Sequence, residues 1–188
     1  MEFDEKRDKV EKQVIEYLTK RKFREASLAV AAYEAEQPYP RGIGIDWKHY
    51  NPDNDIKKLK TIFESKPKIL KQLGDEKLEA VRIAAAMMTL CGKNKAKKWL
   101  PNDFKTDLPF DGDITARMLN FYATHQATLE GYRKGRVVEY VEVFPATDSC
   151  VSCRKLAGRH YTFNEAPELP YENCIHKMGC RCCYLPVV

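Results

Sequence analysis

The sequence lacks the short motifs of the common enzyme classes. It has no phosphate-binding glycine loop, no H-E-x-x-H, no G-x-S-x-G and no pair of carboxylates that stands out from ordinary helix charge. It has no apolar run near the ~20 residues of a membrane-spanning helix, and it has neither an internal repeat nor a low-complexity tract. These absences favour a soluble, non-enzymatic protein without membrane contact, and no catalytic residue is predicted.

Cysteine is almost absent from the first 149 residues. Cys91 stands alone there, on an apolar helical stretch, and is most simply a small buried residue. The other six of the seven cysteines fall in the last 39 residues. A Cys-x2-Cys pair, followed after a loop by a second cluster of soft ligands, is the spacing that tetrahedral Zn(II) requires. The six are Cys150 and Cys153, then after a gap of 20 residues Cys174, Cys180, Cys182 and Cys183.

Disulfide bonds are the alternative to a metal. The chain opens with charged residues from Glu2 to Asp8, the reverse of a signal peptide, so we expect a cytoplasmic protein, or a virion protein if a phage encodes it. Cysteines in such a setting stay reduced. Reduced cysteines at this spacing are more often metal ligands than a disulfide framework.

Four ligands complete a zinc site, and the sequence offers more than four. The first choice is Cys150, Cys153, Cys174 and Cys180. The alternatives replace Cys174 by His176 or Cys180 by Cys182, and Cys183 is expected to be a packing residue. No position is left for water, so the expected Zn(II) is structural. Its negative charge would be balanced by nearby basic residues, namely Arg154, Lys155, Arg159, Lys177 and Arg181.

Most of the chain has the periodicity of amphipathic helices. A change to alternating β-branched and aromatic residues predicts a strand at 137–144, with a second antiparallel strand at 159–163. The expected fold is mainly α: a bundle-like helical domain at 1–110, then a long helix and a small β-hairpin zinc module at 111–188. Asp113 is expected to cap the long helix. Helices are predicted at 4–19, 23–37, from 53, at 75–91 and at 113–134. The helix at 75–91 is the most apolar and should lie at the centre of the core.

The C-terminal motifs resemble those of the head-morphogenesis or minor head proteins of tailed phages, the family typified by the F protein of phage Mu. That family has a helix, a strand, a turn with C-x2-C, Leu-x-Gly, an aromatic residue, an acidic-proline segment and a closing Cys-Arg-Cys. Lys177 stands where the family has a histidine. The matching residues are Ala116-Arg117 through Tyr132-Arg133, Val141-Glu142-Val143, Asp148 to Cys153, Leu156-Ala157-Gly158, Tyr161, Ala166 to Pro170 and Gly179 to Val187.

The resemblance implies a non-enzymatic, zinc-stabilised structural or interaction protein with a protein partner. One alternative is zinc-dependent nucleic-acid binding, because the chain carries a formal charge of +5. Its contacts would come from Arg154, Lys155, Arg159 and Arg181. A second alternative is an enzyme or toxin, with nucleophile pairs drawn from Cys182 or Cys183 with His160 or His176, or a pocket at His49 and Asp46. The loop around Trp47, His49 and Tyr50 is expected to fold back onto the helices.

Overall fold

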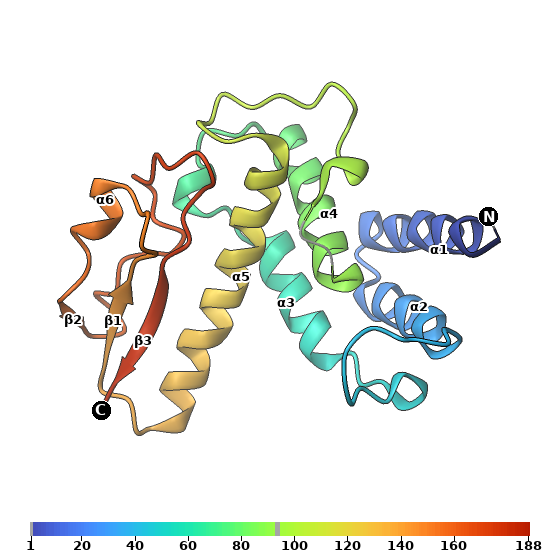
Figure 1. Cartoon of the computed structure of the whole chain (residues 1–188), viewed down its shortest axis with the longest axis horizontal. Coiled ribbons are helices and arrows are strands. Elements are labelled where there is room, and N and C mark those ends of the chain that lie inside the picture. Colours follow the sequence, from blue (N-terminus) through green and yellow to red (C-terminus); the bar gives the residue numbers. More distant parts are fainter. Residues whose placement is uncertain (1, 93–94) are drawn as a thin grey trace.

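Helices make up most of the protein, and a small sheet lies at its C-terminal end (Figure 1). The computed structural model describes residues 2–92 and 95–188. The predicted mainly α fold is confirmed. The described elements are α1 (Glu2–Thr19), α2 (Phe23–Ala35), η1 (Trp47–His49), α3 (Asp53–Glu64), η2 (Lys68–Leu70), α4 (Asp75–Cys91), η3 (Lys97–Trp99), α5 (Gly112–Gly135), β1 (Tyr140–Phe144), α6 (Val151–Arg154), β2 (His160–Tyr161) and β3 (Cys183–Val187).

Helix α4 lies at the centre of the helical body, as its apolar sequence predicted. Most of its side chains from Leu78 to Leu90 are buried, and it packs against α1, α3 and α5. Small side chains at Ala84–Ala86 let the neighbouring helices approach it closely. The buried residues form one core that continues across residue 110, where the domain boundary was predicted. Among the described helices, none is both long and apolar enough to cross a bilayer.

Helix α5 lies between the helical body and the sheet (Figure 1). It packs against α3 and α4, and also against β3. The Asp111 carboxylate accepts a hydrogen bond from the backbone N–H of Ile114 at 2.8 Å and caps the helix. The prediction that Asp113 caps it was wrong, because Asp111 has the extended backbone that a cap requires. Asp113 instead accepts a hydrogen bond from the backbone N–H of Ala96.

The sheet has three antiparallel strands in the order β2–β1–β3. β1 and β2 form the expected hairpin, but β3 is a third strand that the sequence reading missed. It pairs along the whole of β1, from Tyr140 opposite Val187 to Phe144 opposite Cys183. Pro186 argues against a strand in sequence, yet an edge strand tolerates proline because one side of its backbone has no strand partner.

The inner face of the sheet is packed towards α5. Val141 and Val143 of β1 are fully buried, and Tyr184 of β3 lies on the same side. The Tyr184 ring meets the His125 ring of α5 edge-on, with centroids 5.5 Å apart. His125 is therefore the buried core histidine that the α5 stripe predicted.

The loop between α2 and α3 folds back onto the helices, as expected. Trp47 is buried, and its indole N–H donates a hydrogen bond to the Arg41 carbonyl at 2.7 Å. The Tyr50 ring stacks on Trp47. The side chain of His49 is 84% exposed, so this loop does not enclose it in a pocket.

Candidate metal centre

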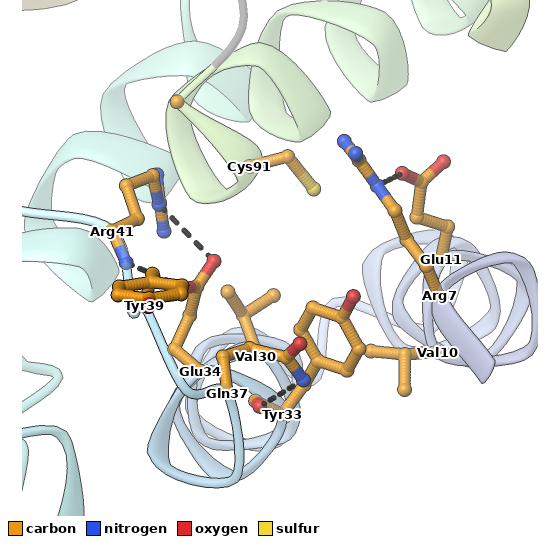
Figure 2. A pocket seen from close by; sticks show the side chains of 11 residues that line it. Arg7, Val10, Glu11, Val30, Tyr33, Glu34, Gln37, Tyr39, Arg41 and Cys91 are labelled. Carbon is orange, nitrogen blue, oxygen red and sulfur yellow. Dashed lines mark hydrogen bonds and ion pairs between the residues drawn. The ribbon is translucent and has the colours of Figure 1, made fainter. Parts of the chain in front are cut away.

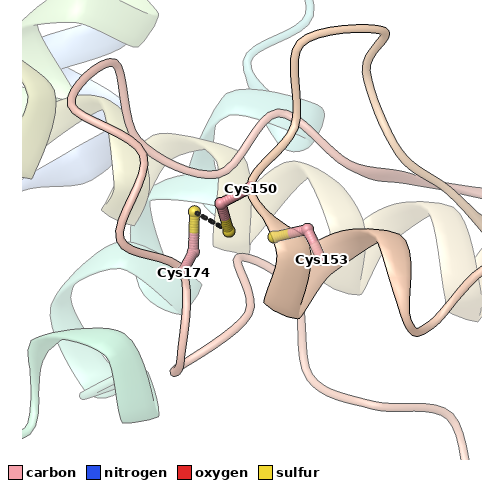
Figure 3. A group of neighbouring side chains, drawn as sticks. All are labelled: Cys150, Cys153 and Cys174. Atoms are coloured by element: carbon pink, nitrogen blue, oxygen red, sulfur yellow. Dashed lines mark hydrogen bonds between the residues drawn. The ribbon is translucent and has the colours of Figure 1, made fainter.

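Three cysteines from two segments meet beside the start of α6. Cys150 is the residue before α6 and Cys153 lies within it, so the helical turn places both sulfurs on one side. Cys174 comes from the loop that follows the cis-proline at Leu169–Pro170. Figure 3 shows the three sulfurs directed towards one another. They lie within 4.8 Å of each other, with Cys150 Sγ and Cys174 Sγ 3.9 Å apart.

A second group of three sulfurs shares one member with the first. Cys153, Cys180 and Cys182 also lie within 4.8 Å of one another, and all three are buried. Cys153 Sγ and Cys180 Sγ are 3.9 Å apart. Five thiols thus form two neighbouring groups that share Cys153, and the side chains of each group could hold a metal ion. Cys182 immediately precedes β3, and Cys180 lies two residues before Cys182 in the same segment.

The thiols hydrogen-bond to one another. The pKa of Cys180 is lowered, chiefly by its hydrogen bond with Cys153 and next by that with Cys174. The pKa of Cys153 is raised by its hydrogen bonds, first with Cys174 and then with Cys180. At Cys150 burial raises the pKa, but hydrogen bonds to the Cys153 and Ile175 backbones outweigh it and leave the pKa lowered. Metal binding would replace these shared protons, because the ligating form is the thiolate.

His176, an alternative ligand in the sequence reading, lies in neither sulfur group. Its Nδ1 accepts a hydrogen bond from the Met178 backbone N–H at 3.1 Å. Its Nε2 lies 3.6 Å from an Asp148 carboxylate oxygen. The same carboxylate receives a hydrogen bond from Arg181 at 2.5 Å. His176 therefore belongs to a polar contact beside the sulfurs rather than to their cluster.

The basic residues predicted to surround the site divide into two kinds. Arg181 is paired with Asp148, which is the first cause of its raised pKa, and the thiols of Cys174 and Cys182 raise it further. Arg181 is thus placed to balance thiolate charge. The other four residues, Arg154, Lys155, Arg159 and Lys177, are exposed.

The predicted nucleophile pairs do not gather into a catalytic arrangement in the described residues. Cys183 contacts the Phe144 carbonyl at 3.9 Å, and burial raises its pKa. His160 is exposed on β2. His49 and Asp46 form a hydrogen bond at 2.8 Å on the protein surface, and that bond is the chief reason why the pKa of Asp46 is lowered.

The closing loop of the site rests directly on α5. Gly179 has φ of +74°, a left-handed conformation that favours glycine. A Cβ at this position would lie 2.6 Å from Met118 Cε and 2.9 Å from Ile114 Cγ2. The next residue, Cys180, donates its backbone N–H to Met118 Sδ at 3.2 Å. Sequence reasoning missed Met118 and Gly179, because only the tertiary contact between α5 and the loop reveals their role.

Two polar contacts also support the sulfurs and were not expected. The buried Ser149 side chain forms a hydrogen bond with the Cys182 thiol. The hydrogen bond with Cys153 has the larger effect and lowers the pKa of Cys182, as does the bond with Ser149, but the hydrogen bond with Cys180 and burial raise it and leave the pKa raised. The Tyr184 hydroxyl donates to the Pro167 carbonyl at 2.7 Å and accepts from the Leu169 N–H at 3.1 Å. These bonds hold the segment before Cys174 against the sheet. A serine beside a Cys-x2-Cys turn is the one signal that could have indicated the first contact.

A separate cavity of about 390 Å³ lies among α1, α2 and the end of α4 (Figure 2). Its two arginines are each paired with a glutamate: Arg7 with Glu11 and Arg41 with Glu34. Cys91 faces the cavity, and burial raises its pKa to about 11. A thiol with that pKa is almost entirely protonated at neutral pH and is a poor nucleophile.

Comparison of the chain with protein-family models, with curated proteins and with solved structures finds no match. The resemblance to phage minor head proteins therefore rests on the C-terminal motifs alone. The clustered cysteines indicate a candidate metal site.

Proposed function

We propose that this is a non-enzymatic protein whose C-terminal module is stabilised by one structural Zn(II) and serves in protein assembly, as in phage head morphogenesis. The proposed ligands are Cys150, Cys153, Cys174 and Cys180. The observation that carries the proposal is the spacing of the sulfurs. A tetrahedron with Zn–S bonds of about 2.3 Å has sulfurs about 3.8 Å apart, and two sulfur pairs lie 3.9 Å apart.

The ligand type favours zinc over other ions. Thiolates are soft ligands that suit Zn(II), Cu(I) and iron–sulfur clusters, whereas Mg²⁺ and Ca²⁺ prefer oxygen. A four-thiolate site leaves no coordination position for water, and closed sites of this kind are structural. The zinc would therefore stabilise the fold and would not activate a nucleophile.

Cys180 is a better fourth ligand than Cys182. Cys180 Sγ lies 3.9 Å from Cys153 Sγ, and a hydrogen bond with Cys174 is a further cause of the lowered pKa of Cys180. Cys182 forms hydrogen bonds with Cys153, Cys180 and Ser149. The pKa of Cys174 responds to a hydrogen bond with Cys180, and this link to the first sulfur group favours Cys180 as the fourth ligand.

The chain around the site needs such an anchor. Between β1 and β3 the only regular elements are the four-residue α6 and the two-residue β2. So little regular structure leaves few backbone hydrogen bonds to hold the segment, and metal binding would supply folding free energy in their place. The zinc would hold together α6, the Cys174 loop and the segment that leads into β3, and so fix the sheet on α5.

Metal analysis of three serine variants tests this proposal. The protein is purified without added zinc, and bound metal is measured by elemental analysis and native mass spectrometry. The unaltered chain should carry one zinc. If structural zinc binding contributes about 10–16 kcal/mol, one of four ligands accounts for about 2.5 kcal/mol or more. Cys180→Ser should therefore weaken zinc binding about 70-fold or more in a competition with a chromophoric chelator.

Cys182→Ser and Cys183→Ser are the matched controls, because they remove thiols from the same segment. Both should retain one zinc with near-normal affinity. A purified chain without metal, but with reactive thiols, would overturn the zinc proposal. Equal losses in Cys180→Ser and Cys182→Ser would instead overturn the choice of ligands.

A further inference from the structure

The outer face of the sheet, opposite α5, carries rings and apolar side chains in the open. Along β1, Val141 and Val143 point inward, so Tyr140, Glu142 and Phe144 point outward. Tyr140 is 40% exposed and Phe144 is 55% exposed. Leu185 of β3 and His160 of β2 both lie opposite Glu142, and both are exposed. We call this set the outer face: Tyr140, Phe144, His160 and Leu185.

Three of its four side chains are flat rings. Tyr140 and His160 come from neighbouring strands, and their rings are nearly parallel, at 29°, with centroids 6.4 Å apart. Phe144 stands at the other end of β1. Exposed apolar groups gathered on one face usually mark an interaction site. Rings fixed on a sheet are also the platform on which unpaired bases stack in several single-strand-binding folds.

The stretch of chain that contains β1 and leads into β2 carries mostly positive charges. From Arg133 to His160 the chain has six arginines and lysines and three acidic residues. Asp148 is paired with Arg181, and the carboxylate of Glu142 accepts a hydrogen bond from the Gly158 N–H at 3.0 Å. Exposed Glu139 is the third acidic residue. Four cations are exposed and form no ion pair within the described part of the chain: Arg136, Arg154, Lys155 and Arg159.

We propose that the outer face binds single-stranded nucleic acid, with bases stacked on Tyr140, His160 and Phe144. The phosphates would lie against these four exposed cations, which the chain carries just before β1 and between β1 and β2. A polyanion with exposed flat bases matches both the rings and the cations, whereas an apolar protein surface would match the rings alone. A duplex would not match, because its bases are already stacked inside. The inference goes beyond the structural zinc and does not depend on which thiols hold it.

Fluorescence anisotropy with a labelled 15-nucleotide oligo(dT) tests the proposal, using the full chain with its native metal content. Binding should weaken as salt rises. If four phosphates are contacted, the affinity should fall about 50-fold between 50 and 200 mM salt. A duplex of the same length should bind at least tenfold more weakly.

Two leucine variants separate stacking from general apolar contact. Tyr140→Leu and Phe144→Leu keep an apolar side chain but remove a ring, and each should weaken oligo(dT) binding about fivefold or more. The matched control is Tyr39→Leu, since Tyr39 is 92% exposed in the loop after α2. It should have no effect. Circular dichroism and zinc content establish that each variant is folded.

A pair of charge reversals tests the phosphate contacts. Arg154→Glu with Lys155→Glu should abolish detectable binding, and it should flatten the salt dependence. Lys9→Glu with Lys12→Glu makes the same charge change on exposed residues of α1, at the opposite end of the molecule (Figure 1). This control should weaken oligo(dT) binding less than twofold.

Three results would overturn the proposal. The first is no oligo(dT) binding at 50 mM salt. The second is equal loss in the α1 control, which would mean that net charge alone attracts the nucleic acid. The third is unchanged binding in both leucine variants; self-association lost in those same variants would then assign the outer face to a second copy of the chain.

Discussion

Replacement of Gly179 by alanine tests how the metal loop is seated on α5. The loop approaches so closely that an added Cβ would lie 2.6 Å from Met118 Cε and 2.8 Å from Met118 Sδ. The φ of +74° adds backbone strain for any residue with a Cβ. Both effects raise the free energy of the folded state, so we expect Gly179→Ala to be destabilised.

The magnitude follows from the two contributions. A left-handed backbone costs about 1–2 kcal/mol for an L-residue other than glycine. Overpacking a well-filled site costs typically ~1–3 kcal/mol. Methionine is flexible and can move part of the way, so the steric cost should lie within that range rather than above it. The expected loss in the free energy of unfolding is about 2–5 kcal/mol.

Gly158→Ala is the matched control for the backbone contribution. Gly158 has φ of +70°, and a Cβ there would meet no atom within 4 Å. Gly158→Ala should lose only about 1–2 kcal/mol in the free energy of unfolding. Both variants are unfolded in urea at one fixed excess of free zinc, because bound metal makes apparent stability depend on its concentration.

The difference between the two variants isolates the contact with α5. Equal destabilisation, within about 0.5 kcal/mol, would refute the close approach. A double-mutant cycle with Met118→Ala adds a second check, because the smaller side chain should accommodate the new methyl group. The double variant should then be more stable than the sum of the single losses by about 1–2 kcal/mol.

Two further predictions concern buried polar groups. Glu11 is buried, and although burial opposes its ionisation, hydrogen bonds from Lys98, Trp99 and Arg7 lower its pKa. Glu11→Gln should lower the free energy of unfolding by about 2–3 kcal/mol at pH 7. Because the pKa of Glu11 is lower in the folded state than in the unfolded state, its ionised carboxylate stabilises the fold at pH values above the unfolded-state pKa, and the loss should shrink as the pH falls below about 4.3. Urea unfolding at several pH values measures this dependence. Tyr184→Phe removes the partner of the buried Leu169 N–H and of the half-buried Pro167 carbonyl, and it should cost about 1–3 kcal/mol in the same assay. An unchanged midpoint would contradict these two hydrogen bonds.

Periodicity predicted the helices well, because each buries an apolar stripe that recurs along a continuous stretch of chain. The apolar face of α4 and the buried His125 of α5 could both be read directly. The hairpin of β1 and β2 is also local, and alternation from Val137 to Val143 indicated it. β3 was missed because its partner lies some 40 residues earlier and Pro186 obscures its pattern.

The sequence by itself determined that a cysteine cluster would form, because Cys150 and Cys153 lie one helical turn apart and so face the same way. Only the tertiary structure decided which other thiols join them. The Cys174 loop and the start of β3 meet α6 through contacts with α5 and the sheet, and these brought Cys180 and Cys182 to Cys153 while leaving His176 beside Asp148. Spacing along a chain cannot specify contacts between distant segments, because loop conformation and tertiary packing determine them.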